Sequence, residues 1–340
     1  MSDAGFSPYL APDGSPEATR LELADLIERL RHTAEHLPAE QTPHQDLKLL
    51  SRAIRELKHA FGVFAPFRTQ KKVTVFGSAR TARDAPEYVQ AEKLGRAMVE
   101  KGWLVVTGAA TGIMEAGHRG AGRENSMGIN IMLPFEQSAN EVIRGDAKLV
   151  TMKYFFTRKL MFVKECDAVV CLPGGFGTLD EAFETLTLLQ TGKRELIPLV
   201  LLDAPGGSYW TDWLAFIEKQ LLQTGMISPD DLALLKLTDS VDETVDEVTR
   251  FYRVFHSMQY VSERLMLRLR RPIEERKLAA IERDFSDILA SGRFELRDPP
   301  PGEQDDPALA PLTRLSFHFN RRNHGRLRQL VDWLNREIHR

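Results

Sequence analysis

The stretch of this 340-residue sequence that is best suited to chemistry covers residues 171–184, with the letters CLPGGFGTLDEAFE. It follows an apolar run, 167–172, that is typical of a buried parallel strand, and leucines at helical spacing come after it. A strand, a glycine-rich turn and a helix place free backbone N–H groups and a helix dipole in front of an anion. The turn is therefore predicted to bind a phosphate or a similar group.

Each small residue of this turn admits a functional and a structural explanation. Gly174, Gly175 and Gly177 would let the backbone adopt φ > 0 and approach a ligand that a Cβ would exclude. Thr178 is expected at the helix N-cap, where its hydroxyl could bind a phosphate oxygen. Thr178 and Glu181 also fit the S/T-x-x-E capping box, in which Glu181 would only close the first helical turn. Three glycines preceded by a proline exceed what capping needs, which favours the functional explanation.

The letters PGGFGTLDE, at 173–181, resemble the PGGxGTxxE signature of the LONELY GUY (LOG) family, nucleoside 5′-monophosphate phosphoribohydrolases that were long described as lysine decarboxylases. The resemblance covers about residues 71–255 and leaves out both ends. It implies catalytic roles for Glu181 and for Arg158, which precedes the motif at about the family's interval. From the residues alone, Arg158 and Lys159 could equally form a solvated helix face.

A second small-residue turn follows the run at 103–107. The family usually has three glycines and then GIMEA here, and this sequence keeps Gly108, Gly112, Met114 and Glu115 of that pattern. Ala109 and Ala110 stand where glycines are usual, and their two methyl groups are expected to narrow the approach to a ligand. Glu115 would bind ribose hydroxyls, although a surface charge that complements the helix dipole is an equal alternative.

The expected site thus combines residues that follow several strands. The predicted substrate-binding residues are Gly77, Ser78, Gly108, Gly112, Met114, Glu115, Lys159, Pro173, Gly174, Gly175, Gly177 and Thr178. Cleavage of an N-glycosidic bond passes through an oxocarbenium-like ribose. Glu181 would act there as a base or an electrostatic stabiliser. Arg158 would ease departure of the base or hold the phosphate, because a guanidinium scarcely deprotonates.

The resemblance implies hydrolysis of nucleoside 5′-monophosphates, of the AMP or cytokinin-riboside type, to free base and ribose 5-phosphate. The alternative is a non-catalytic nucleotide or molybdenum-cofactor binding or sensor protein, since related Rossmann-like proteins with PGGxGT motifs carry ligands. A decarboxylase is not favoured, because lysine decarboxylation needs an electron sink such as pyridoxal phosphate and no Schiff-base lysine context stands out. We expect no cofactor, and no metal either, because the nine histidines form no HExxH or Cys/His cluster.

An alternating strand and helix pattern begins at residue 72 and predicts an α/β fold, a Rossmann-like doubly wound parallel sheet. Strands are expected at 72–76, 103–107, 128–133, 167–172 and 197–202. Helices are expected at 86–101, 112–122, 154–165, 178–191, 208–223 and 241–256. Such sheets bind ligands beyond the carboxyl ends of their strands, where the small-residue turns lie. The long connection 135–152 could border the nucleobase pocket.

Three parts are predicted along the chain: an N-terminal helical extension (1–70), the Rossmann-like LOG domain (71–258) and a small α+β module (259–340). The extension has amphipathic patterns at 17–37 and 43–61, whose apolar faces must be buried on the core or on a partner subunit. The C-terminal module is expected in the order β-α-β-β-α, with strands at 260–271, 294–296 and 315–319, helices at 273–289 and 326–338, and a Pro-rich loop at 299–306. The resemblance implies a homodimer or a higher homo-oligomer.

Composition limits the remaining classes. The chain has 43% hydrophobic and 27% charged residues, as in an ordinary globular protein, and its net charge of −3 gives no global basic field. Nucleic acid is not favoured, because the arginines near the C-terminus accompany no stacking-aromatic motif. Cys166 and Cys171 are expected to be buried, inert thiols. With neither a leader pattern nor an apolar run near ~18 residues, the sequence predicts a cytoplasmic protein without membrane spans.

Overall fold

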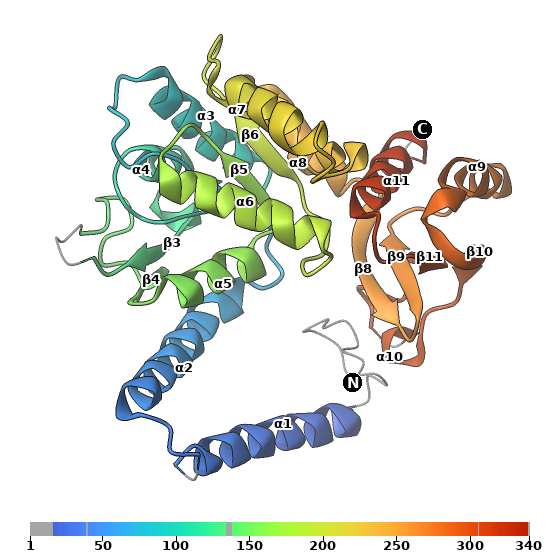
Figure 1. Cartoon of the computed structure of the whole chain (residues 1–340), viewed down its shortest axis with the longest axis horizontal. Coiled ribbons are helices and arrows are strands. Elements are labelled where there is room, and N and C mark those ends of the chain that lie inside the picture. The colour runs from blue at the N-terminus through green and yellow to red at the C-terminus, as the bar shows by residue number, and fades with distance from the viewer. Residues whose placement is uncertain (1–15, 39, 134–137, 305, 339–340) are drawn as a thin grey trace. The chain divides into compact units, whose positions relative to one another are not determined.

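The computed structural model describes residues 16–38, 40–133, 138–304 and 306–338 (Figure 1). It forms two compact units, one made of residues 53–251 and 322–329 and the other of the remaining residues. The three-part division expected from the sequence stays a prediction.

The first unit contains a seven-stranded sheet in the order β4-β3-β2-β1-β5-β6-β7. All neighbouring strands are parallel. The strands are β1 (Lys72–Phe76), β2 (Leu104–Thr107), β3 (Ser126–Ile131), β4 (Leu149–Met152), β5 (Ala168–Cys171), β6 (Leu199–Leu202) and β7 (Lys236–Thr238). The chain winds outward from β1 to β4 and then returns to β5 on the other side of β1. This arrangement confirms the predicted doubly wound α/β fold.

The central strands are buried along their whole length, which explains their near-continuous apolar sequences. Val73 of β1 is paired with Val105 of β2 on one side and with Ala168 of β5 on the other. This register aligns the ends of β1, β2 and β5, so the turns that follow them meet at one edge of the sheet.

In the described part of this unit, the helices that follow the strands are α3 (Pro86–Glu100), α4 (Ile113–Ala121), α5 (Phe155–Glu165), α6 (Phe176–Gln190), α7 (Tyr209–Ile217) and α8 (Val241–Phe251). Helices α3 and α4 pack closely, α3 also contacts α8, and α5 contacts β3 and β4. Glycines allow the close approach of α3 and α4, because a Cβ on Gly120 would come 2.8 Å from the carbonyl carbon of Glu92. Short turns lie at η1 (Ala65–Phe67), η2 (Arg123–Asn125) and η4 (Pro229–Leu234), and a π-helical turn, η3 (Glu218–Leu222), extends α7.

Several sequence expectations for this unit are wrong. The connection 135–152 ends in an unexpected edge strand, β4, and its residues 135–137 lie outside the described chain. Strand β7 was also not expected. The helix expected at 208–223 is α-helical only to Ile217, and the one expected at 241–256 ends at Phe251. Both β4 and β7 are short and partly exposed, so neither has the long apolar run that marks the central strands.

The second unit contains a four-stranded antiparallel sheet in the order β10-β11-β9-β8. From residue 252 on, its elements are β8 (Phe255–Val261), β9 (Arg264–Leu269), α9 (Glu275–Phe285), η5 (Ser286–Ile288), β10 (Leu289–Arg297), α10 (Pro301–Gln304), β11 (Thr313–Phe319) and the C-terminal part of α11 (His324–Glu337), a helix whose residues 324–329 belong to the first unit. The single strand expected at 260–271 is therefore wrong, because a hairpin bends at Ser262, where φ is 54°. A non-glycine residue at this turn gave no hairpin signal. The Pro-rich loop at 299–306 contains α10.

A buried ion-pair cluster explains two arginines inside the second unit. Glu303 bridges Arg268, at 2.6 Å, and Arg314, at 2.8 Å, and all three side chains are almost fully buried. Paired carboxylate and guanidinium groups satisfy each other's hydrogen bonds, which is the condition for burying such charges.

The N-terminal helices are α1 (Pro16–His36) and α2 (His44–Phe64). Leu23, Leu26, Ile27 and Leu30 form an exposed apolar stripe on α1. The apolar positions of the 43–61 pattern are Leu47, Leu50, Ile54, Leu57 and Phe61, but the residues of α2 that are buried are Ala53, Glu56, Ala60 and Phe64, and Ile54 is 60% exposed. Among the helices that the structure describes, none is both long and apolar enough to cross a membrane.

Candidate active site

A pocket of about 770 Å³ opens at the carboxyl ends of β1, β2, β3 and β5. It lies at the point where the strand order reverses, the usual ligand site of doubly wound sheets. Ten of the predicted site residues line it: Gly77, Ser78, Gly108, Met114, Arg158, Gly174, Gly175, Gly177, Thr178 and Glu181. Gly112, Glu115, Lys159 and Pro173 do not line it. Whether the lining residues bind substrate stays a prediction.

The turn after β1 is fixed by its two neighbours. The Ser78 N–H donates to the Pro173 carbonyl at 3.2 Å, and the Ile113 N–H donates to the Ser78 carbonyl at 3.0 Å. Gly112 has φ of 64°, and a Cβ there would come 2.7 Å from the Ala79 carbonyl carbon. Pro173 and Gly112 therefore shape the pocket from behind its wall.

The glycines of the 174–177 turn were expected to adopt a positive φ and to admit a ligand, and the structure supports only part of this. None of Gly174, Gly175 and Gly177 has a positive φ. A Cβ on Gly174 would come 2.8 Å from the Thr178 Cβ and 2.9 Å from the Ser78 nitrogen, so close packing requires glycine there. A Cβ on Gly175 or Gly177 would meet no protein atom within 4 Å, and both residues line the pocket. Their bare backbone is therefore free for a ligand.

Helix α6 begins earlier than expected. Its N-cap is Gly175 and its first residue is Phe176, so Thr178 lies within the first turn. The Thr178 N–H donates to the Gly175 carbonyl at 3.0 Å. The expected N-cap role of Thr178 is therefore wrong, and so is the Thr178–Glu181 capping box that depends on it. Glu181 is left with no capping duty.

Glu181 is a buried carboxylate at the pocket wall, 8% exposed. Its Oε1 lies 3.3 Å from the Lys159 Nζ. Burial raises the pKa of Glu181 to about 7, with a further increase from Glu184, while Lys159 and Arg158 act against it. A carboxyl group with this pKa can accept or release a proton near neutral pH, as general acid–base catalysis requires.

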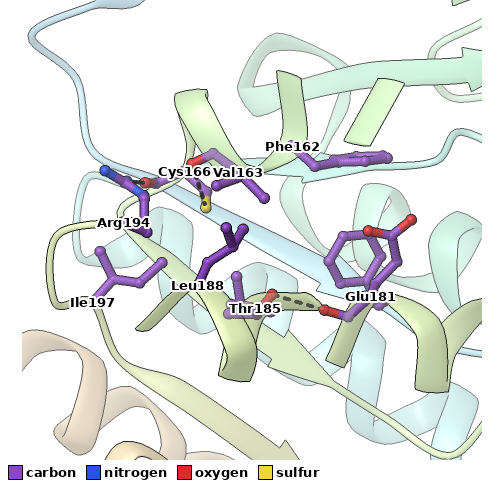
Figure 2. A pocket seen from close by; sticks show the side chains of 10 residues that line it. Phe162, Val163, Cys166, Glu181, Thr185, Leu188, Arg194 and Ile197 are labelled. Atoms are coloured by element: carbon purple, nitrogen blue, oxygen red, sulfur yellow. Dashed lines mark hydrogen bonds between the residues drawn. The ribbon is translucent and has the colours of Figure 1, made fainter. Parts of the chain in front are cut away.

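The packing behind Glu181 explains its desolvation. Figure 2 shows Glu181 beside a small cavity between α5 and α6, near Phe162, Val163 and Leu188. The cavity measures about 10 Å³, the lower limit for a single water molecule, so no ligand fits. The Thr185 hydroxyl donates to the Glu181 backbone carbonyl at 2.8 Å, whereas the Glu181 carboxylate pairs with Lys159 at 3.3 Å.

Arg158 enters the pocket from α5. Its Nε donates to the Ile129 carbonyl at 2.8 Å, and its guanidinium lies 5.0 Å from the centroid of the Phe162 ring. Burial lowers the pKa of Arg158 to about 10, and Glu181 acts in the opposite direction. The side chain therefore stays a cation at neutral pH and places a positive charge beside the titratable Glu181 in the pocket lining, which also contains Arg80 and Asp180.

Glu115 is not among the residues that line the pocket. It is buried and accepts a hydrogen bond from the exposed Arg83 Nη2 at 2.5 Å. The expected contact with ribose hydroxyls stays a prediction, and any such contact would have to compete with Arg83.

The two alanines of the second turn point in different directions. Ala109 has φ of 60° and is fully buried in an apolar cluster with Ala139, Ile143 and Leu149. Its methyl group therefore does not narrow the pocket, contrary to the expectation. Ala110 does line the pocket. Its carbonyl accepts a hydrogen bond from the Asn140 side chain at 3.0 Å, which fixes this turn.

Sequence reasoning missed several lining residues. Asn130, at the end of β3, is buried and polar, and apolar side chains of Leu133, Phe155 and Phe176 add a hydrophobic part to the lining. A polar residue within an apolar strand is the only signal that could have identified Asn130. The exposed fraction of Phe176, 93%, is unusual for a phenylalanine and marks the rim of the pocket.

The cysteines are buried and unpaired, as expected. Burial raises the pKa of both thiols, which keeps them protonated and unreactive. Among the residues that the structure describes, no group of three histidine, cysteine, aspartate or glutamate side chains is placed to hold a metal ion.

A parallel sheet wound both ways from β1, with a glycine-rich helix start at its switch point, defines a Rossmann-like α/β protein. A family described as "Possible lysine decarboxylase" matches residues 107–248. A cytokinin riboside 5′-monophosphate phosphoribohydrolase of Mycobacterium tuberculosis is 31% identical over 160 residues, 46% of this chain and 81% of its own length. The chain belongs to the LONELY GUY family.

A probable cytokinin riboside 5′-monophosphate phosphoribohydrolase of rice, Oryza sativa subsp. japonica, is 34% identical over 164 residues, 47% of this chain. The match spans 63% of the rice protein. Among solved structures, a molybdenum cofactor binding protein of Rippkaea orientalis is 20% identical, with 53% of this chain and 96% of that chain covered and a TM-score of 0.38.

Proposed function

We propose that this protein hydrolyses the N-glycosidic bond of nucleoside 5′-monophosphates to free base and ribose 5-phosphate. The observation that carries the proposal is the buried Glu181 carboxylate beside the Arg158 cation, both facing a pocket that ends at a glycine-rich helix start. The named activity of the M. tuberculosis and rice relatives supports the same reaction. AMP and cytokinin riboside monophosphates are the proposed substrates.

The start of α6 is the proposed phosphate site. The N–H of Thr178 already donates to the Gly175 carbonyl, but helix geometry leaves the N–H groups of Phe176 and Gly177 without a partner in α6, and the helix dipole adds partial positive charge there. Gly175 and Gly177 leave that backbone uncovered, and the Thr178 hydroxyl lies in the same wall. A 5′-phosphate bound there fixes the ribose over Glu181, one turn further along α6.

Glu181 is proposed to act on the water that attacks C1′. As C1′ develops oxocarbenium character, the carboxylate stabilises the positive charge and takes a proton from the attacking water. The water oxygen then bonds to C1′ while the C1′–N bond breaks. The base leaves with the bonding electrons and takes its proton from solvent, because Arg158 remains a cation and stabilises the departing group by hydrogen bonding.

The apolar part of the lining is proposed to hold the nucleobase. Leu133, Phe155 and Phe176 offer hydrophobic surface at the rim, and an aromatic ring stacks favourably on a planar base. Asn130 adds a carboxamide that can donate to and accept from a base or ribose.

Homo-oligomerisation is a second part of the proposal. The stripe of Leu23, Leu26, Ile27 and Leu30 on α1 has the i, i+3, i+4, i+7 spacing of a helix that packs on another apolar surface. Light scattering after size exclusion tests this: an assembly larger than 38.5 kDa is expected, and Leu26→Glu with Leu30→Glu should reduce it. A monomeric wild type would contradict it. We also propose a cytoplasmic location, testable by cell fractionation.

Chromatography of free base released from a panel of nucleoside 5′-monophosphates, with the matching nucleosides, tests the reaction. Release from monophosphates but not from nucleosides is expected, because only the monophosphates engage the start of α6. Tight nucleotide binding without release from any of them would contradict hydrolysis and favour a carrier or sensor.

A further inference from the structure

Lys159 connects three acidic side chains instead of facing the pocket. It comes from α5, and its Nζ lies 2.9 Å from the Asp180 Oδ2, 3.3 Å from the Glu181 Oε1 and 2.9 Å from the Glu184 Oε2. These carboxylates belong to one stretch of α6. Lys159 is absent from the pocket lining, whereas its neighbour Arg158 is part of it.

The ammonium group has its donors committed. A lysine has three N–H donors, and three carboxylate oxygens lie within 3.3 Å of this one. The side chain of Lys159 is only 18% exposed, so solvent screens these contacts weakly. A substrate phosphate would have to displace a carboxylate in order to bind Lys159.

We propose that Lys159 is a positioning residue that fixes the orientation and charge state of Glu181, and that it does not bind the substrate. This inference rests on the proposed function, in which the Glu181 carboxylate receives the proton of the attacking water. It differs from the substrate-binding role that the sequence resemblance suggests for Lys159.

Three charged neighbours act on Glu181: the Lys159 and Arg158 cations of α5 lower its pKa, and the Glu184 carboxylate of α6 raises it. The Lys159 cation favours the charged carboxylate, while the Glu184 carboxylate disfavours it. Removing the cation should therefore raise the pKa of Glu181, whereas removing the Glu184 charge should lower it. If Lys159 only stabilised the fold or only bound the substrate, the two substitutions would not shift the pKa of Glu181 in opposite directions.

The test compares pH profiles of base release by the wild type, Lys159→Met, Glu184→Gln and Lys159→Arg. For the wild type, kcat should rise with pH through about pH 7, as Glu181 loses its proton. The rise should move up by on the order of one pH unit in Lys159→Met, move down in Glu184→Gln and stay near wild type in Lys159→Arg. Lys219→Met, an exposed lysine on η3, is the control and should not move it.

The kinetic constants separate the two roles. At pH 7, a rise of about one unit in the pKa of Glu181 leaves roughly a tenth of it ionised, so Lys159→Met should lower kcat by about fivefold or more and change KM by less than about threefold. A raised KM with an unmoved pH profile would overturn the proposal and make Lys159 a substrate ligand. If Lys159→Met does not fold, the pH profiles of Glu184→Gln and Lys159→Arg still test the proposal.

A direct titration is independent of turnover. The Glu181 carboxyl carbon can be followed by ¹³C NMR, with Glu181→Gln used for assignment. The same opposite shifts in Lys159→Met and Glu184→Gln are expected, and unchanged titration in both would refute the proposal. If the wild type hydrolyses no monophosphate, the proposed function fails, and this titration alone decides the link between Lys159 and Glu181.

Discussion

The guanidinium of Arg158 lies directly against the backbone of Gly108. A Cβ on Gly108 would overlap the Arg158 Nη2 and come 2.7 Å from the Met114 Sδ. Arg158 is held from its other side by the Ile129 carbonyl. Because Gly108 has no side chain, the Arg158 guanidinium can occupy this position in the pocket.

Gly108→Ala should displace Arg158 while leaving the sheet intact. The added methyl group has no room unless the guanidinium moves, and a shift of about 1 Å in a reacting group can cost on the order of a hundredfold in rate. We expect kcat/KM for base release to fall by about tenfold to a hundredfold, with an unchanged circular dichroism spectrum. Wild-type kinetics would show that the position of Arg158 is unimportant.

Alanine at two glycines of the PGGFGT motif should have opposite effects. Gly174→Ala forces contact with Thr178 and Ser78 and should destabilise the fold by about 1–3 kcal/mol. Gly177→Ala meets no protein atom and lies in a helix, where alanine is favoured, so its Tm should not fall. Its KM should rise, because the methyl group enters the proposed phosphate site. Thermal melts and kinetics of both variants measure this, and an unchanged KM for Gly177→Ala would argue against phosphate binding there.

The two alanines of the second turn offer a matched pair. Ala109→Gly removes a buried methyl group, which should lower the free energy of unfolding by about 1 kcal/mol. The left-handed backbone at this position costs a residue with a Cβ about the same free energy, and glycine avoids that cost. Its free energy of unfolding should change by less than about 1 kcal/mol and its KM should stay unchanged. Ala110→Val, in the pocket lining, should raise KM severalfold. The reverse order of KM effects would contradict the positions of these side chains.

The buried His118 should make the protein sensitive to acid. It accepts a hydrogen bond from Asn140 and donates to the Met127 carbonyl, which requires the neutral ring. Burial lowers the pKa of His118 to about 4, below its unfolded value of 6.5. The native state therefore binds fewer protons, and on the order of 3 kcal/mol of stability is lost as the pH falls from 6.5 towards 4.

Urea unfolding at pH 7 and pH 4.5 measures this loss. His118→Gln should be less stable than the wild type at pH 7, because it loses packing, but should lose less stability between the two pH values. His59→Gln, an exposed histidine, is the control and should behave like the wild type. Equal pH dependence in all three proteins would contradict a buried neutral His118.

The sequence predicts this fold well where burial dominates. Runs such as 104–106 and 168–171 are apolar because the central strands are buried on both faces. The edge strand β4 lacks that signal, since Leu149 and Thr151 are partly or fully exposed. Its position depends on pairing with β3, a tertiary contact that no local pattern contains.

Some features of the site could be predicted from the sequence and others could not. The glycine turn and Glu181 could be identified because local backbone geometry and the family resemblance depend on consecutive residues. The pairing of Lys159 with three carboxylates of α6 could not, because it depends on how α5 packs against α6. The start of α6 was misplaced because Thr178 and Glu181 imitate a capping box, while Gly175 caps the helix without a side chain.

Glu181→Gln tests the central claim most directly. The amide keeps the size of the side chain but cannot accept the proton of the attacking water. Base release from the preferred monophosphate should fall by about 10²–10⁴-fold, while calorimetry should show monophosphate binding within severalfold of the wild type. Wild-type turnover by this variant would contradict the role of Glu181 and the mechanism built on it.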